Sequence, residues 1–135
     1  MSHRSRLLSL IAGLIFLIAS LHLAATLFSL YWTLWWFDII LHLLGGIFAG
    51  LLVLWLRFFS GYIGTSPVPP GKKLIPLVVL GVVGIGVGWE VFERLLGHTW
   101  SVEGYWLDTT VDIVLDLLGG MLALGYFTRR FITHE

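Results

Sequence analysis

Four long apolar runs dominate the pattern of hydrophobic and polar positions along the chain, and they cover residues 7–30, 36–59, 74–96 and 109–131. A helix needs about 20 predominantly apolar residues to cross the hydrocarbon core of a bilayer, and each run reaches that length. The first run contains no Asp, Glu, Lys or Arg, and the acids of the third and fourth runs stand at one end only. The pattern predicts an all-α fold, a four-helix transmembrane bundle in which residues 1–135 form a single integral membrane domain.

The first apolar run also has one feature of a secretory signal peptide, because Arg4 and Arg6 precede it. The apolar region of a signal peptide is only about 7–15 residues long and ends at a small-residue cleavage site. The run at residues 7–30 is longer and has no convincing site of that kind. We therefore expect it to be retained as a membrane anchor.

Composition supports a membrane protein and excludes several other classes. Hydrophobic residues make up 58% of the chain and charged residues only 12%, far outside the range of soluble globular domains. The eight basic and eight acidic residues cancel, so overall charge gives no reason to expect a nucleic-acid partner. The chain has no cysteine, which excludes disulfides and thiolate metal ligands. The lipid bilayer is the partner that composition predicts.

The basic residues predict how the bundle is oriented. Seven of the eight lie on one side of the predicted membrane, before the first run, between the second and third runs, and after the fourth: Arg4, Arg6, Arg57, Lys72, Lys73, Arg129 and Arg130. The positive-inside rule then places both termini in the cytoplasm. Aromatic residues gather on the opposite side, where they are typical of the headgroup region: Tyr31, Trp32, Trp35, Trp36, Trp100, Tyr105 and Trp106.

The second and fourth runs contain nearly the same nine residues, DIILHLLGG at 38–46 and DIVLDLLGG at 112–120, of which seven are identical. The Gly- and Pro-rich segment GYIGTSPVPPGKK divides the chain into two helical hairpins, and each hairpin carries one copy. The two copies run in the same direction through the membrane, so the chain would contain two related parallel hairpins. Two helices that meet the same packing demand are the alternative, and we favour duplication.

Ionisable residues form two layers near the side opposite the basic residues. Asp38, Glu93 and Asp112 lie about one helical turn deep, and a second layer lies about two turns deep, formed by His42, Glu90, Asp116 and His22. The spacings i, i+4 in the second and fourth runs and i, i+3 in the third place each pair on one helix face. An ionisable side chain near the bilayer centre costs about 2.5–3.5 kcal/mol on insertion scales and usually faces a bundle interior. We therefore expect three faces to converge.

The converging carboxylates require a positive partner. Protons are one candidate, and a divalent cation is the other, since oxygen and imidazole are its usual ligands. These ligands suit Mn, Zn, Fe(II) or Mg, and the sequence does not choose among them. The predicted metal site comprises Asp38, His42, Glu90, Glu93, Asp112, Asp116 and His22, with Glu90 and Glu93 as candidate catalytic bases.

Several of these residues also have ordinary structural interpretations. Asp108 is expected to cap the fourth helix, and Thr109 with Asp112 has the spacing of a capping box. Glu90 and Arg94 have the i, i+4 spacing of a helix ion pair. A single histidine in a helix is more often a packing residue than a ligand, so the two interpretations of His22 stay open. His98 and Glu103 lie in a predicted loop, where ionised side chains need no special reason.

Glycines predict close helix contacts. Gly46 with Gly50, and Gly84 with Gly88, are pairs of small residues spaced four apart, a spacing that lets transmembrane helices approach closely. Such faces would also allow a homo-oligomer. A glycine pair ends each copy of the repeat, and its lack of side chains would bring the second and fourth helices together beneath the polar cluster: Gly45, Gly46, Gly119 and Gly120.

Three motifs, WWFDIILHLLGG, GWEVFERLLG and DTTVDIVLDLLGG, resemble the YjdF-like and VanZ-like families of small bacterial and archaeal membrane proteins. The resemblance covers roughly residues 31–120 and implies a location in the cytoplasmic (inner) membrane of a prokaryote. It supports Asp38, His42, Glu90, Glu93, Asp112 and Asp116 as the polar set. VanZ-like proteins are associated with glycopeptide resistance, but this chain departs from their pattern where a Gln and an Asn are expected. No agreed chemistry comes with either family.

Three functions share this predicted site. The first is an outward-facing metal-dependent hydrolase that acts on a lipid or lipid-linked substrate. The second is ion or proton transport or relay, and the third is a membrane interaction module without catalysis. A transport path would continue in polar residues toward the cytoplasm, but the inner halves of the second, third and fourth runs are apolar apart from their terminal basic residues. We therefore favour a site over a conduit.

Overall fold

A computed structural model describes residues 3–63, 68, 71–96 and 104–132 of the chain. Every regular element in these ranges is helical: α1 (His3–Leu27), α2 (Leu30–Thr33), α3 (Phe37–Phe58), the 3-10 turn η1 (Gly71–Leu74), α4 (Ile75–Leu96) and α5 (Tyr105–Phe131). Four of the helical stretches are long and apolar enough to cross a membrane: Arg4–Leu27, Phe37–Phe58, Gly71–Leu96 and Tyr105–Phe131. The prediction of an all-α bundle with four membrane-spanning helices is confirmed.

The first predicted run is divided in the structure. Helix α1 ends at Leu27, and Ser29 adopts a left-handed backbone conformation with φ of 55°, which a continuing α-helix does not allow. The short helix α2 follows directly. The last residues of the predicted run, 28–30, therefore form a turn and the start of α2 instead of continuing α1. This break matters for the site because it turns Tyr31 back toward the bundle.

The fourth helix begins four residues earlier than the predicted residue 109. Gly104 occupies the N-cap position of α5, and its carbonyl accepts hydrogen bonds from the backbone N–H groups of Leu107 and Asp108. Asp108 therefore lies within the first turn, and the prediction that it caps the helix is wrong. Its carboxylate still stands near the positive end of the helix dipole.

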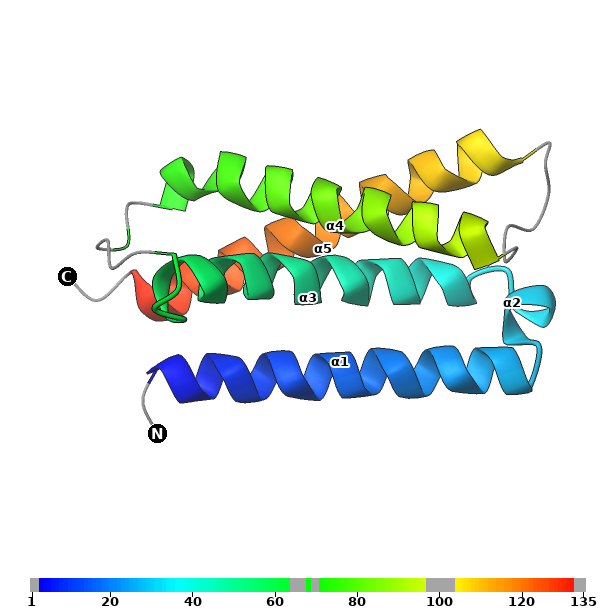
Figure 1. The fold of residues 1–135 in the computed structure, drawn as a ribbon, viewed down its shortest axis with the longest axis horizontal. Coiled ribbons are helices and arrows are strands. Elements are labelled where there is room, and N and C mark those ends of the chain that lie inside the picture. Colours follow the sequence, from blue (N-terminus) through cyan, green and yellow to red (C-terminus); the bar gives the residue numbers. More distant parts are fainter. Residues whose placement is uncertain (1–2, 64–67, 69–70, 97–103, 133–135) are drawn as a thin grey trace.

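Helix α3 is the centre of the bundle. Figure 1 shows α3 between α1 and α4, with α5 crossing behind it, and the start of α1 lies at the same end of the bundle as the end of α5. Helix α1 packs against α3 and α2, whereas α4 packs against both α3 and α5. The most extensive helix contact joins α3 to α5, the two helices that carry the repeated sequence.

Glycines explain why α3 and α5 approach so closely. A Cβ atom built on Gly46 would overlap the backbone carbonyl of Asp116, and one built on Gly119 would overlap the backbone of α3 at Leu43 and Ile47. The expected contact beneath the polar cluster is therefore present. The second small-residue pair behaves differently, because Cβ atoms on Gly84 and Gly88 would meet nothing within 4 Å. On α4 the glycines in contact are Gly81 and Gly86.

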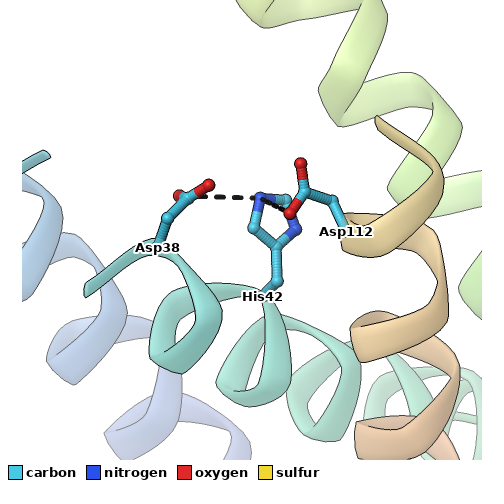
Figure 2. A group of neighbouring side chains, drawn as sticks. All are labelled: Asp38, His42 and Asp112. Atoms are coloured by element: carbon cyan, nitrogen blue, oxygen red, sulfur yellow. Dashed lines mark ion pairs between the residues drawn. The ribbon is translucent and has the colours of Figure 1, made fainter. Parts of the chain in front are cut away.

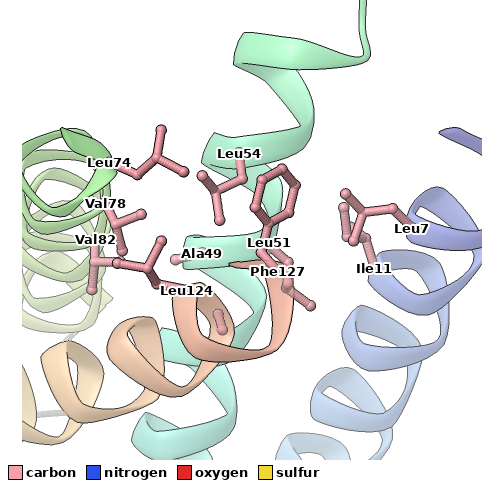
Figure 3. Close-up of a cluster of buried hydrophobic side chains, with 11 residues drawn as sticks. Leu7, Ile11, Ala49, Leu51, Leu54, Leu74, Val78, Val82, Leu124 and Phe127 are labelled. Atoms are coloured by element: carbon pink, nitrogen blue, oxygen red, sulfur yellow. The ribbon is translucent and has the colours of Figure 1, made fainter. Parts of the chain in front are cut away.

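The end of the bundle where α1 begins holds an apolar core. Figure 3 shows side chains from all four long helices and from η1 meeting there, and the cluster comprises Leu7, Ile11, Ala49, Leu51, Leu54, Leu74, Val78, Val82, Ala123, Leu124 and Phe127. Phe127 is completely buried and makes ring contacts with Phe58, Phe59 and Phe131. Because lipid tails are as apolar as these side chains, tight packing rather than hydrophobic transfer holds this end together.

The opposite end of the bundle is fixed by a smaller apolar cluster and carries exposed aromatic residues. Ala25 of α1 packs with Phe37 and Leu41 of α3. Trp32, Trp35 and Trp106 are all more than two-thirds exposed, as expected of side chains at headgroup depth. Trp100, which was predicted to join them, lies outside the described residues.

Candidate metal centre

The first turns of α3 present Asp38 and His42 on one face. Their i, i+4 spacing brings the Asp38 Oδ1 atom to 3.7 Å from His42 Nε2. The imidazole is buried, with 6% of its side chain exposed, whereas Asp38 is 32% exposed. The pair therefore reaches from the bundle interior to its edge.

Asp112 completes the group from α5. Its Oδ1 atom lies 3.7 Å from the same His42 nitrogen, Nε2, and its side chain is buried. Figure 2 shows both carboxylates paired with the same imidazole nitrogen, Asp38 from α3 and Asp112 from α5. The glycine contact between α3 and α5 is what brings together residues 70 or more positions apart in the sequence.

The dimensions of this group are close to those of a site for a small divalent ion. One ligand atom from each of Asp38, His42 and Asp112 lies within 4.8 Å of the others, and no other such group was found in the part of the chain that the structure describes. Bonds of about 2.0–2.2 Å from zinc to oxygen or nitrogen place two ligand atoms at most about 4.4 Å apart. A small inward movement of the side chains would therefore bring all three atoms to coordination distance.

Asp116 lies on the other side of the histidine ring. Its Oδ1 atom is 3.4 Å from His42 Nδ1, the nitrogen that faces away from Asp38 and Asp112. Gly86 of α4 leaves the room for this carboxylate, since a Cβ there would lie 2.5 Å from Asp116 Oδ2. In many metal sites a carboxylate holds the second nitrogen of a ligating histidine and fixes its tautomer and orientation. Asp116 has that position.

Glu90 is buried behind the group and has only part of its hydrogen bonding satisfied. Thr109 Oγ1 donates to Glu90 Oε2 over 2.8 Å, so this threonine joins α5 to α4 and does not form the capping box that its spacing suggested. The other carboxylate oxygen, Oε1, is buried and has no hydrogen-bond partner among the described residues. A buried oxygen in this state is costly unless a proton or a cation satisfies it.

The ion pair expected between Glu90 and Arg94 is absent among the described residues. Arg94 is exposed, and its guanidinium carbon lies 4.1 Å from the centre of the Tyr105 ring. Such a contact stabilises the arginine through the negative face of the ring. Arg94 therefore does not neutralise the charge of Glu90.

A second polar pair faces the group from α1 and α2. His22 Nδ1 and Tyr31 Oη share a hydrogen bond of 2.7 Å, and His22 also contacts the ring of Trp89 edge-on. Burial, together with the negative charges of Asp38 and Glu93, raises the pKa of the Tyr31 phenol above its ordinary value. Sequence reasoning placed Tyr31 only in the aromatic belt, because nothing in the run of aromatic residues distinguishes it from its neighbours.

A cavity of about 340 Å³ connects these groups. Six polar side chains reach its wall, namely His22, Tyr31, Asp38, His42, Glu93 and Asp116, and the rest of the wall is apolar or glycine. Glu93 therefore lies on the open side of the site, whereas Asp112 and Glu90 do not line the cavity. His98 and Glu103, which were given little weight, lie outside the described residues.

The fold and site define a membrane protein with four spans and a buried group of carboxylates around one histidine. The chain belongs to the family described as "Predicted membrane protein (DUF2238)", whose model matches residues 1–132. No curated protein and no solved structure matches it significantly. The family match is compatible with the YjdF-like resemblance and does not support the VanZ-like one.

Proposed function

We propose that this protein is a metal-dependent membrane hydrolase that acts on a lipid or lipid-linked substrate, with Asp38, His42 and Asp112 holding a divalent ion. The observation that carries the proposal is that ligand atoms of these three residues, from two helices, lie within 4.8 Å of one another inside the bundle. Three protein ligands with room for water or substrate are typical of catalytic metal sites. A divalent ion held there would lower the pKa of a bound water and polarise a substrate carbonyl or phosphoryl oxygen.

The other carboxylates have distinct proposed roles. Asp116 would hold His42 Nδ1 so that Nε2 faces the ion, which its 3.4 Å distance supports. Glu93 is the better candidate for a general base, because it lines the cavity where a substrate would lie. Glu90 would act as a further ligand or a deeper proton acceptor, since its buried Oε1 atom has no partner.

The distribution of charge supports an outward-facing site. Seven basic residues were predicted to face the cytoplasm. They belong to the end of the bundle where α1 begins and where α3 and α5 end (Figure 1). The carboxylate group lies toward the other end. By the positive-inside rule, the site opens toward the outer leaflet.

A transport or relay function is less well supported. A path for ions would need polar groups beyond Asp116 and His42 in the direction of the basic end. The structure has instead the apolar cluster around Phe127, Leu54 and Val78 at that end. An ion leaving the carboxylate group in that direction would therefore lose its ligands.

Metal analysis of the purified protein tests the proposal. We expect the wild-type chain in detergent to bind about one equivalent of Mn, Zn, Fe or Mg after exposure to each metal and removal of the excess. His42→Ala and Asp112→Asn each remove a ligand and are expected to lower the bound metal to background. Asp108→Asn is the matched control, because it makes the same change on the same helix at an exposed position.

The results separate the alternatives. Background metal in the wild type with all four ions, or equal metal in Asp112→Asn and Asp108→Asn, would overturn coordination by this group. Loss of metal only in His42→Ala and Asp112→Asn would support it. Release of a fatty acid or headgroup by the loaded wild type, lost in Glu93→Gln with metal retained, would then distinguish a hydrolase from a binding module.

A further inference from the structure

The cavity beside the carboxylate group is an elongated space between α1 and α4, with α3 as its floor. Its wall includes Ile15 and Ile18 of α1, Phe48 of α3, and Val82 and Ile85 of α4. On α3 the wall extends from Asp38 to Ala49, a rise of eleven residue steps, or about 16 Å at 1.5 Å per step. The polar residues stand at one end of this length and apolar side chains line the remainder.

The cavity is accessible from the side of the bundle. Ile15 is 45% exposed, and Ile85 and Trp89 are each 40% exposed, so the α1 and α4 walls are not closed over by other helices. These residues lie in segments that are long and apolar enough to cross the membrane. At that depth the surrounding solvent is hydrocarbon, so molecules that reach the cavity from the side must themselves be lipids.

The volume of the cavity favours one hydrocarbon chain over two. A volume of about 340 Å³ is at the lower limit of the sites that hold small ligands, and here it is spread along a helix face. Helix α1 packs against α2 and α3, and at the polar end its His22 ring contacts the Trp89 ring of α4.

The charges at the polar end select against an anionic headgroup. Three carboxylates line the cavity, Asp38, Glu93 and Asp116, and none of its described lining residues is a lysine or an arginine. Asp112 and Glu90 are buried outside the cavity wall, so a single divalent ion would balance only two of the five carboxylates. Phosphate groups in proteins are usually bound by Arg or Lys, which the cavity wall lacks.

We propose that this cavity binds a lipid with a single hydrocarbon chain and a headgroup without negative charge. The chain lies along α3 between α1 and α4, and the headgroup lies among Asp38, Glu93 and Tyr31. The hydrogen-bonded pair of His22 and Tyr31 offers a donor and an acceptor for a hydroxyl or ester carbonyl. The assignment of this lipid as a substrate rests on the proposed function, but its binding does not.

Lipid binding to the purified full-length protein tests the inference. The probes are monooleoylglycerol, which has one chain and no charge, oleoyl lysophosphatidic acid, which has one chain and a phosphate, and dioleoylglycerol, which has two chains. We expect monooleoylglycerol to bind with an affinity at least about tenfold higher than either of the others, measured by competition against a fluorescent fatty-chain probe. Comparable affinity for all three would overturn the inference.

A pair of substitutions on α1 locates the chain. Ala19 lines the cavity and Ala12, two turns away on the same helix, does not. Ala19→Trp should fill the space and weaken monooleoylglycerol binding at least about tenfold, whereas Ala12→Trp should leave it unchanged. Ile15→Trp is a second filling variant in case Ala19→Trp does not fold. Unchanged binding in a folded filling variant would show that the lipid lies elsewhere.

A metal-site variant separates this inference from the proposed function. Asp112 does not line the cavity, so Asp112→Asn should retain monooleoylglycerol binding even where bound metal is lost. Lipid binding without metal in the wild type would overturn the hydrolase and leave the cavity assignment standing. Metal binding without selective lipid binding would overturn the cavity assignment and leave the hydrolase proposal standing.

Discussion

The two ends of the bundle are built from the same helices but bury different kinds of side chain. At the end where α1 begins, every long helix contributes apolar side chains to one cluster, and Phe127 is buried among aromatic neighbours. At the other end the same α3, α4 and α5 bury His42, Glu90, Asp112 and Asp116. The first end gains stability from its packing, and the second must hold ionisable groups at a cost.

The contrast between the two ends indicates how the bundle can bury ionisable groups and remain folded. Between the two ends, Gly46 and Gly119 bring α3 and α5 into backbone contact, so the carboxylates are held by helices whose relative position is already fixed. The apolar end and the glycine contact together position the site. Four changes test this division, from the largest expected effect to the smallest.

Gly46→Ala is expected to have the largest effect because it separates the helices that both ends depend on. Its Cβ atom would overlap the Asp116 carbonyl, which is backbone and cannot move alone. We expect loss of monodisperse folded protein and of bound metal, measured by size-exclusion chromatography and elemental analysis. Gly84→Ala is the control and should behave as wild type, since its Cβ would meet nothing within 4 Å. Normal folding of Gly46→Ala would mean that α3 and α5 are not in this contact.

Phe127→Ala tests the apolar end alone. In soluble proteins this kind of substitution costs about 3–5 kcal/mol of stability. Here we expect a smaller cost, because moving an apolar side chain from lipid tails into the bundle gains little hydrophobic free energy. The free energy of unfolding in detergent should fall, while the metal bound per folded molecule should stay as in wild type. Tyr126→Ala, at a 42% exposed neighbouring position, should be close to neutral. Loss of metal in folded Phe127→Ala would show that the two ends are more strongly coupled than we propose.

Asp116→Asn tests the support of the histidine. The amide keeps the shape of the side chain but loses the charge that faces His42 Nδ1. Changes of this kind typically weaken metal binding by about 10–100-fold, less than the loss of a ligand. Titration with metal should give a weaker dissociation constant at unchanged stoichiometry. A loss as complete as in Asp112→Asn would make Asp116 a ligand itself.

Thr109→Val should have the smallest effect of the four. It removes the hydroxyl that donates to Glu90 Oε2 and leaves both oxygens of that buried carboxylate without a partner. The expected loss of stability is about 1–3 kcal/mol in thermal or denaturant unfolding. Thr110→Val, which removes a hydroxyl that donates to the Trp106 carbonyl of its own helix, should cost less. Equal effects of the two changes would argue against a buried contact between α4 and α5 at Glu90.

Sequence reasoning was most successful where local pattern decides the outcome. The four apolar runs gave the number and approximate bounds of the spanning helices, because hydrocarbon forces the backbone of any crossing segment to satisfy its own hydrogen bonds. The spacing of Asp38 and His42 gave a shared helix face that the structure retains. The glycines of the repeat gave the helix pair that would meet.

Sequence reasoning was less successful where a partner from another element decides the outcome. Thr109 and Arg94 each have a local spacing that suggests a partner on the same helix, yet Thr109 bonds to α4 and Arg94 lies against Tyr105. Asp38, Asp112 and Asp116 look alike in the sequence, but two of them face one histidine nitrogen and the third faces the other. Which nitrogen each reaches depends on the rotation of α5 against α3.

The sequence by itself therefore determined that this chain spans a membrane with helices, because the bilayer imposes helical hydrogen bonding on each crossing segment separately. It also determined that the acids concentrate toward one side, because their order along each apolar run is read directly from the sequence. Only the tertiary structure decided that Asp38, His42 and Asp112 form one group, that Tyr31 turns inward to His22, and that a cavity opens between α1 and α4. These features depend on distances between helices, and those distances are set by contacts among residues that are far apart in the chain.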